Sequence, residues 1–187
     1  HELLLRQKEI RACVEASPYN ALTLNGERRD IGVITTGIAR NYYFENLEDL
    51  GPTPSHLHVG MYPVPTVKVR QLAEHVKRLV VFEEGYPHLE RQLRGILPLA
   101  VEIQGKESGH VPMDGELNPD IVRRVLGLAE HEGVEVTGIP LAGRPPQFCA
   151  GCPHADTLKA LKLALAGYRG PIVTSDIGCY TLGALPP

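Results

Sequence analysis

The chain has 187 residues, of which 43% are hydrophobic and 22% charged, and its formal net charge is -3 at pH 7. That length suffices for one large domain, or for one domain and part of a second, and the hydrophobic fraction excludes a disordered chain. Acidic and basic residues are interspersed, so nothing indicates a nucleic acid or an anionic membrane as a partner. No apolar run approaches the ~20 residues that a membrane-spanning helix needs.

The sequence starts at His1 without an initiator methionine or the apolar core of a signal peptide, and it stops at Pro187 just after a glycine-rich segment. We therefore expect an internal piece of a longer protein. The four cysteines are too sparse for a secreted disulfide scaffold, and two of them form a C-x-x-C motif. This cysteine usage predicts a reducing compartment, the cytoplasm, and a metal or redox site.

Predicted strands and helices alternate through the first two thirds of the sequence. An exposed helix over residues 3–16 mixes apolar and charged residues and ends before Pro18. The elements that follow are, in chain order, a strand at 31–35, a helix at 38–49, a strand at 56–59, a helix at 65–76, a strand at 79–82, a helix at 87–96, a strand at 101–103 and a helix at 119–131. This alternation predicts right-handed βαβ units, and hence an α/β domain whose parallel sheet is covered by helices.

A second, different unit is predicted after a connector at residues 133–146, which is rich in glycine and proline. It consists of the C-x-x-C loop, a helix over 155–166, a strand at 172–174 and a loop through Cys179. We expect a domain boundary in the connector.

Three cysteines of the second unit carry the candidate chemistry. Cys149 and Cys152 lie just before a helix, where backbone N–H groups and the helix dipole favour thiolates. Cys179 follows the predicted strand, and ligands of such sheets collect where strands end and helices begin. Gly178 beside it allows a close approach of a cofactor. We therefore predict that the three sulfurs meet at one edge of this unit.

Several kinds of site fit three such cysteines. A [4Fe–4S] cluster would need a fourth ligand from elsewhere, and zinc would need His154 as well, at a cramped spacing from Cys152. A thioredoxin-like pair leaves Cys179 unexplained, whereas a chance motif would make it an ordinary buried thiol. Haem attachment is excluded because Pro153 stands where a histidine is required.

Other polar side chains are better explained by structure than by chemistry. Glu83 and Glu84 follow a strand and suit the positive end of the helix that Pro87 opens. His110 lies in a glycine-rich loop that favours a packing role.

The motifs around the three cysteines resemble the start of the thiamine pyrophosphate domain of the 2-oxoacid:ferredoxin oxidoreductases, in particular the large (alpha) subunit of the indolepyruvate type. They read F-C-A-G-C-P-H-A-D-T and S-D-I-G-C-Y-T-L-G-A-L-P-P. Upstream, I-G-V-I-T-T-G-I-A, V-V-F-E-E-G-Y-P-H-L-E, G-K-E-S-G-H-V-P and G-E-L-N-P-D-I-V resemble the middle domain of that subunit.

The resemblance implies four segments in an α/β architecture. Residues 1–29 would be an N-terminal helix and connector, and 30–131 a transketolase-C-terminal-like middle domain with a parallel sheet. Residues 132–147 would be a linker, and 148–187 the truncated start of the thiamine pyrophosphate-binding domain.

The resemblance also implies the chemistry. The family oxidatively decarboxylates arylpyruvates such as indolepyruvate with thiamine pyrophosphate and Mg2+. It passes electrons through [4Fe–4S] clusters to ferredoxin and the acyl group to coenzyme A, and it pairs this subunit with a smaller beta subunit. By position, Cys149, Cys152 and Cys179 match the ligands of the cluster near thiamine in related enzymes. The residues that match thiamine contacts are Ile177, Gly178, Cys179, Tyr180 and His154.

The magnesium-binding motif, the activating glutamate and the remaining clusters of the family lie outside these residues, so the fragment alone is expected to be inactive. A second hypothesis is a non-catalytic module. In that case residues 30–131 would be an interaction domain, and the cysteines would hold a structural zinc ion.

Overall fold

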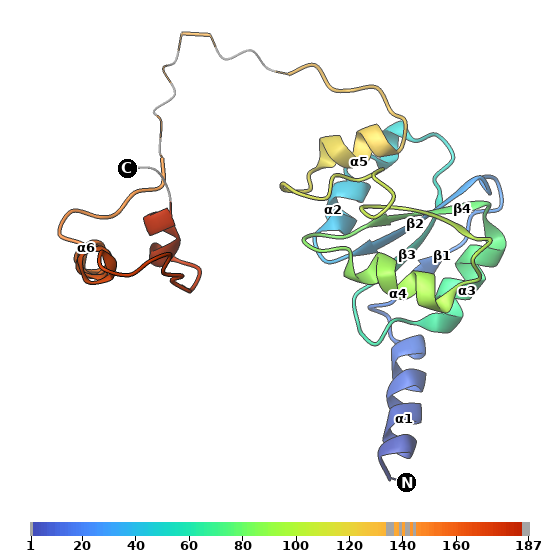
Figure 1. Ribbon diagram of the computed structural model, residues 1–187. Coiled ribbons are helices and arrows are strands. Elements are labelled where there is room, and N and C mark those ends of the chain that lie inside the picture. The colour runs from blue at the N-terminus through green and yellow to red at the C-terminus, as the bar shows by residue number, and fades with distance from the viewer. Residues whose placement is uncertain (1, 134–136, 139, 141–142, 144, 185–187) are drawn as a thin grey trace. The chain divides into compact units, whose positions relative to one another are not determined.

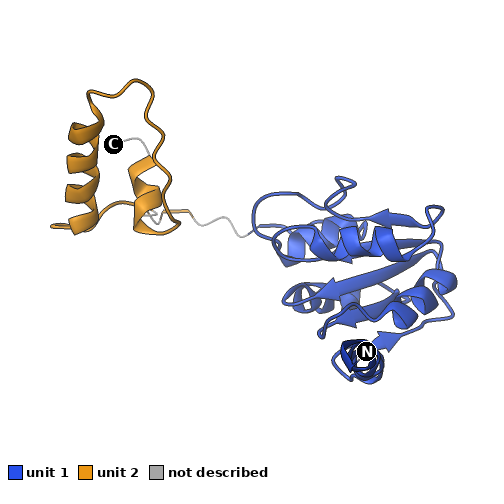
Figure 2. Ribbon diagram, turned by 60° about the horizontal axis from the view of Figure 1, so that its bottom comes forward, with its two compact units in different colours: residues 1–133 blue, residues 134–187 orange. Residues whose placement is uncertain are grey.

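The structure is a computed structural model that describes residues 2–133, 137, 138, 140, 143 and 145–184. Two compact units divide the chain, residues 1–133 and residues 134–187 (Figure 2). The predicted connector at 133–146 and the last residues of the second motif, 185–187, fall partly or wholly outside the described residues. No helix of the described residues is long and apolar enough to cross a membrane.

The first unit is built on a five-stranded sheet with the order β1-β3-β2-β4-β5 (Figure 1). Its strands are β1 (Leu22–Thr23), β2 (Ile31–Thr36), β3 (Ser55–Val59), β4 (Arg78–Phe82) and β5 (Glu102–Gln104). Strands β2 to β5 run parallel, whereas β1 pairs antiparallel with β3. The α/β class and the mainly parallel sheet predicted from the sequence are confirmed; only the two-residue edge strand β1 was not predicted.

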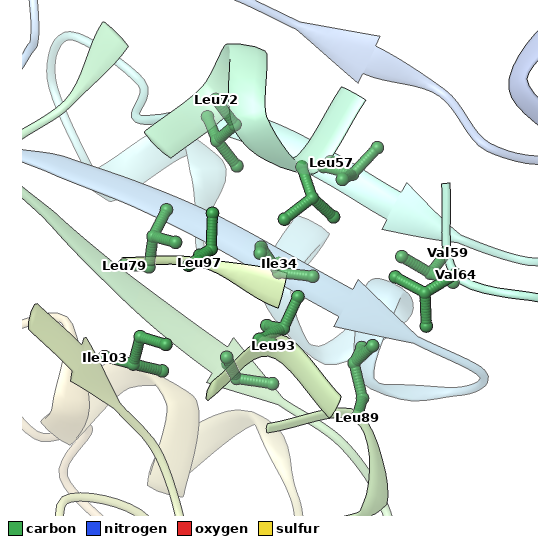
Figure 3. Close-up of a cluster of buried hydrophobic side chains, with 12 residues drawn as sticks. Ile34, Leu57, Val59, Val64, Leu72, Leu79, Leu89, Leu93, Leu97 and Ile103 are labelled. Carbon is green, nitrogen blue, oxygen red and sulfur yellow. The ribbon is translucent and has the colours of Figure 1, made fainter. Parts of the chain in front are cut away.

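Helices cover both faces of this sheet (Figure 1). They are α2 (Ala39–Phe44) and α5 (Pro119–Val125) on one face, and α3 (Thr66–His75) and α4 (His88–Ile96) on the other. Successive side chains of a strand point to opposite faces, so each buried strand supplies both cores. Ile34, for example, packs toward α3 and α4 in the cluster of Figure 3, whereas its neighbour Val33 packs toward α2 and α5.

Helix α1 (Glu2–Ala16) lies largely outside the two cores, as the charged pattern predicted, and only Val14 is buried. The Glu15 carboxylate at its end accepts the backbone N–H groups of Val67 and Lys68 at 2.8 and 3.4 Å, which attaches α1 to the first turn of α3.

The helix predicted at 38–49 is interrupted by Asn46. In a continuous helix the Asn46 N–H would bond to the Tyr42 carbonyl. Instead the side-chain amide donates to that carbonyl at 2.9 Å and to the Pro119 carbonyl at 3.0 Å. Helix α2 therefore ends before Asn46, and a separate 3-10 turn (Leu47–Asp49) follows. A side chain that competes for a backbone acceptor is the reason for the difference.

The helix predicted at 119–131 begins as expected but ends early. Asn118 Oδ1 accepts the Ile121 N–H at 2.9 Å, which is the predicted N-cap. At the other end Gly127 has a φ of 76°, and the N–H groups of Gly127 and Leu128 donate to the carbonyls of Arg124 and Arg123, each at 3.1 Å. This Schellman arrangement needs a glycine and closes the helix.

Glycine at position 105 is predicted to be essential for the packing of α4. An added Cβ would lie 2.8 Å from Cδ of Glu90, which is fully buried and whose carboxylate binds Arg94 at 2.6 Å and the Glu107 N–H at 2.9 Å. Because this carboxylate cannot move freely, Gly105→Ala should lower the free energy of unfolding by about 1–3 kcal/mol in urea titrations.

Gly95 is the matched control, since it lies inside α4 and a Cβ there meets nothing within 4 Å. Gly95→Ala should raise stability by roughly 0.5–1 kcal/mol. Equal effects of the two substitutions would contradict the account of Gly105.

Candidate functional site

The C-x-x-C loop is a tight turn that leads directly into α6 (Pro153–Leu165). The Cys152 N–H donates to the Cys149 carbonyl at 3.1 Å, and Gly151 adopts a φ of 70°. Cys152 is the N-cap residue and Pro153 fills the first helical position, where its missing N–H costs nothing. The local sequence therefore places both cysteines at the positive end of a helix, as predicted.

The second motif forms a loop and the short 3-10 helix η2 (Cys179–Ala184). Gly178 precedes this helix with a φ of 127°, and a Cβ built on it meets nothing within 4 Å. The Thr181 hydroxyl accepts the Gly178 N–H at 3.2 Å, and the Thr181 N–H donates to the Gly178 carbonyl at 3.0 Å. Thr181 is a residue that the sequence analysis missed. The sequence signal for this role is the three-residue spacing of Gly178 and Thr181. In a capping box, the side chain of the third helical residue likewise accepts the N–H of the N-cap residue.

The structure brings three of the predicted site residues together. Nδ1 of His154 lies 3.6 Å from Sγ of Cys152. The His154 ring also meets Tyr180 edge to face, with centroids 4.9 Å apart and an angle of 85° between the planes. His154 thus contacts both motifs at once. Ile177, by contrast, is 92% exposed and does not join this group of residues.

One expected feature of this unit is wrong. Residues 172–174 are not a strand, and Ile172 is 91% exposed. A strand requires a neighbour for its backbone hydrogen bonds, and the described part of this unit supplies none. The position of the Cys179 segment relative to α6 therefore depends on the packing of η2 on α6, and not on the end of a sheet strand.

Among the described residues, no three histidine, cysteine or acidic side chains lie close enough to hold one metal ion. All four cysteines are free thiols, with Cys13 on α1 of the other unit. Beside the candidate site, a cavity of about 240 Å³ lies between α6 and the chain that returns to η2. Its walls include Leu158, Leu161, Leu165 and Tyr180, so the space is mainly apolar.

A second cluster of polar groups lies within the first unit. The buried Thr35 hydroxyl bonds to Nε2 of His56 at 2.8 Å and to Nδ1 of His58 at 3.0 Å. Burial lowers the pKa of His56 to about 3, and the positive charges of His58 and Arg40 add to this effect. Burial also lowers the pKa of His58. His56 is therefore a neutral side chain that completes the core, and its ring packs against Tyr43.

The three polar residues that the sequence singled out in the first unit, Glu83, Glu84 and His110, also have structural partners; Glu84 Oε1 accepts the Leu117 N–H at 3.2 Å. The Glu83 carboxylate is buried and accepts the N–H groups of Leu89 and Glu90 at 2.7 and 2.9 Å, at the start of α4. Burial raises its pKa, although these N–H groups act in the opposite direction. His110 is exposed, and its Nδ1 lies 2.9 Å from the Ser108 hydroxyl within the same loop.

These observations define the chain as an α/β domain followed by a cysteine-bearing unit that begins with a C-x-x-C turn. The chain is 36% identical to the indolepyruvate oxidoreductase subunit IorA of Methanothermobacter thermautotrophicus in an alignment of 200 residues. This alignment covers 100% of the chain and 32% of the relative. The IorA subunit of Thermococcus kodakarensis is 32% identical in an alignment of 204 residues, which covers 100% of the chain and 31% of the relative. The subunit of Archaeoglobus fulgidus is 33% identical over 84% of the chain.

The chain belongs to the family of indolepyruvate oxidoreductase IorA subunits in the region that it covers, which is about a third of their length. No family model matches it. A chain of the 2-oxoglutarate:ferredoxin oxidoreductase of Magnetococcus marinus aligns with 67% of it, at 17% sequence identity and a TM-score of 0.45. That likeness is too slight to carry an argument.

The burial of His56 predicts a pH dependence of stability. The pKa is about 3 in the folded chain and 6.5 in an ordinary histidine. Between these values the unfolded chain binds a proton that the folded chain does not, so the free energy of unfolding should fall as the pH falls from 6.5 toward 3. Urea titrations across this range measure it.

His56→Gln should flatten that slope, although it also lowers stability at neutral pH. His88→Gln, a change at an exposed side chain, is the control that should leave the slope in place. If stability depended on pH equally in the unsubstituted chain and in His56→Gln, this would contradict a neutral, buried His56.

Proposed function

We propose that the chain is an internal part of the large subunit of an indolepyruvate:ferredoxin oxidoreductase. The observation that carries this proposal is the alignment of the whole chain, both cysteine motifs included, with proteins named indolepyruvate oxidoreductase subunit IorA. The reaction is the oxidative decarboxylation of arylpyruvates to aryl-acetyl-CoA, with ferredoxin as the electron acceptor. In this assignment residues 30–131 form the middle domain, 132–147 the linker, and 148–187 the start of the thiamine pyrophosphate domain.

The chemistry of the donors fits an iron–sulfur cluster, because cluster iron is bound by cysteine thiolates. Cys149, Cys152 and Cys179 would supply three of them, and the fourth would come from beyond these residues. Cys149 and Cys152 share one turn at a helix N-terminus. Closure of the Cys179 loop toward this turn would complete the set.

The segment around Gly178 fits the approach of thiamine pyrophosphate. Nothing occupies the space beside its Cα, and Ile177 presents an exposed apolar side chain next to it. Cys179, Tyr180 and His154 complete the contacts that we assign to the cofactor. Thiamine pyrophosphate supplies the electron sink that 2-oxoacid decarboxylation requires. Its Mg2+ would be held by residues outside this chain.

The partners follow from the same assignment. They are a smaller beta subunit, ferredoxin, coenzyme A and the arylpyruvate. The free thiols support a location in the reducing cytoplasm.

Substitution of Gly178 tests the thiamine assignment. In the full-length subunit with its smaller partner, Gly178→Trp should abolish thiamine pyrophosphate binding in calorimetric titrations, because the indole would fill the space that the cofactor needs. Gly170→Trp is the matched control, since Gly170 lies in the same unit, also has a positive φ and also has open space beside it. Unchanged thiamine binding in Gly178→Trp would refute the assignment.

Metal content separates the proposal from a structural module. The full-length subunit, purified without oxygen, should contain iron and acid-labile sulfide that decrease in Cys149→Ser, whereas Cys13→Ser should retain them. Stoichiometric zinc with no iron would instead support the non-catalytic module.

The 187-residue chain alone should not decarboxylate indolepyruvate with added thiamine pyrophosphate and Mg2+, and measurable turnover would contradict its proposed place within a larger enzyme.

A further inference from the structure

The contact between the two cysteine motifs has a regular pattern. His154 and Leu158 are four residues apart on α6, and such residues lie on one face of an α-helix. Tyr180 and Gly183 are three residues apart on η2, and residues at this spacing are aligned on a 3-10 helix. His154 contacts Tyr180, and a Cβ built on Gly183 would lie 2.5 Å from Cδ1 of Leu158. Two matching pairs therefore join the helices.

The order of these pairs fixes the direction of the two helices. The earlier residue of α6, His154, meets the earlier residue of η2, Tyr180, and the later residues Leu158 and Gly183 meet in turn. The helices therefore run parallel, with their first residues at the same end. Cys152 immediately precedes α6, and Cys179 is the first residue of η2. Both cysteines consequently lie at that shared end.

We propose that His154 and Tyr180 are positioning residues, which hold the Cys179 loop beside the C-x-x-C turn so that the three sulfurs can serve one centre. The inference rests on the proposed function for the identity of that centre, but the contact itself does not. His154 is suited to the role because its Nδ1 also lies 3.6 Å from Sγ of Cys152. The His154 ring thus links Cys152 of the first motif to Tyr180, the residue that follows Cys179 in the second motif.

Gly183 determines how closely the helices approach. Because it has no side chain, Leu158 packs directly against its backbone, and any larger residue would displace Leu158. The aromatic pair lies one helical turn nearer to the cysteines. Loss of the Tyr180 ring should therefore release the Cys179 end of η2 while the Gly183 end retains its contact.

The effective concentration of Cys179 for Cys152 measures this placement without iron, thiamine or substrate. Cys13→Ser and Cys149→Ser are introduced so that only these two thiols remain, and the chain is equilibrated with mixtures of oxidised and reduced glutathione. In the reaction, the two thiols and one oxidised glutathione give a protein disulfide and two reduced glutathione molecules. Mass spectrometry gives the fraction of disulfide at each ratio.

Tyr180→Leu should lower the effective concentration by roughly two- to tenfold, the range that corresponds to the loss of one aromatic pair. Tyr180→Phe should stay close to the unsubstituted value, because the ring is retained. Tyr168→Leu should also leave it unchanged, since Tyr168 lies in the same unit, beyond the far end of α6, and is 70% exposed.

The chemical shifts of the His154 ring in NMR spectra measure the contact with Tyr180 independently. The His154 signals should move on Tyr180→Leu and stay in place on Tyr180→Phe and Tyr168→Leu. An effective concentration that Tyr180→Leu leaves unchanged, or that Tyr168→Leu lowers equally, would overturn the positioning role. Failure of the full-length subunit to bind iron or thiamine would overturn only the proposed function.

Discussion

The packing of the short helix η2 against α6 is the constraint on which the cysteine-bearing unit depends. The described part of this unit contains no sheet that could order its loops, and no residue of α6 is buried. Contacts of His154 with Tyr180 and of Leu158 with Gly183 relate the two motifs in space. Because these contacts align the helices in parallel, both motifs have their cysteines at the same end.

The first unit contrasts with this arrangement because several of its buried polar side chains have hydrogen-bond partners within the unit. The Glu83 carboxylate binds backbone N–H groups of α4, and the Thr35 hydroxyl lies between His56 and His58. Buried groups with complete hydrogen bonds stabilise one conformation of a core. Glu83, Thr35, His56 and His58 therefore have a structural explanation within the first unit.

Much of the first unit could be predicted from its sequence. Runs such as Ile31–Thr36 and Arg78–Phe82 are short, β-branched and separated by helical patterns, so a mostly parallel sheet follows. The interruption at Asn46 could not be predicted, because it depends on a carbonyl of Pro119 that is distant in sequence. By contrast, Gly127 was a local signal for the end of α5 that helical periodicity concealed.

The second unit was less predictable for a physical reason. Its sequence at 172–174 has the composition of a strand, but strand formation depends on a partner that the sequence of this segment does not reveal. The C-x-x-C turn and the start of α6 were predictable, because proline and glycine determine them locally. The contact of His154 with Tyr180 joins two separate segments, and no local pattern indicates it.

The most direct test of the account is the number of thiolates that one metal ion can gather in this chain. Cadmium is a soft ion that binds thiolates strongly, and the 113Cd NMR chemical shift reports how many sulfurs surround it. With Cys13→Ser in place, the account predicts a single site with three sulfurs, which loses one of them in Cys179→Ser. A site with two sulfurs whose shift is the same after Cys179→Ser would contradict the shared centre.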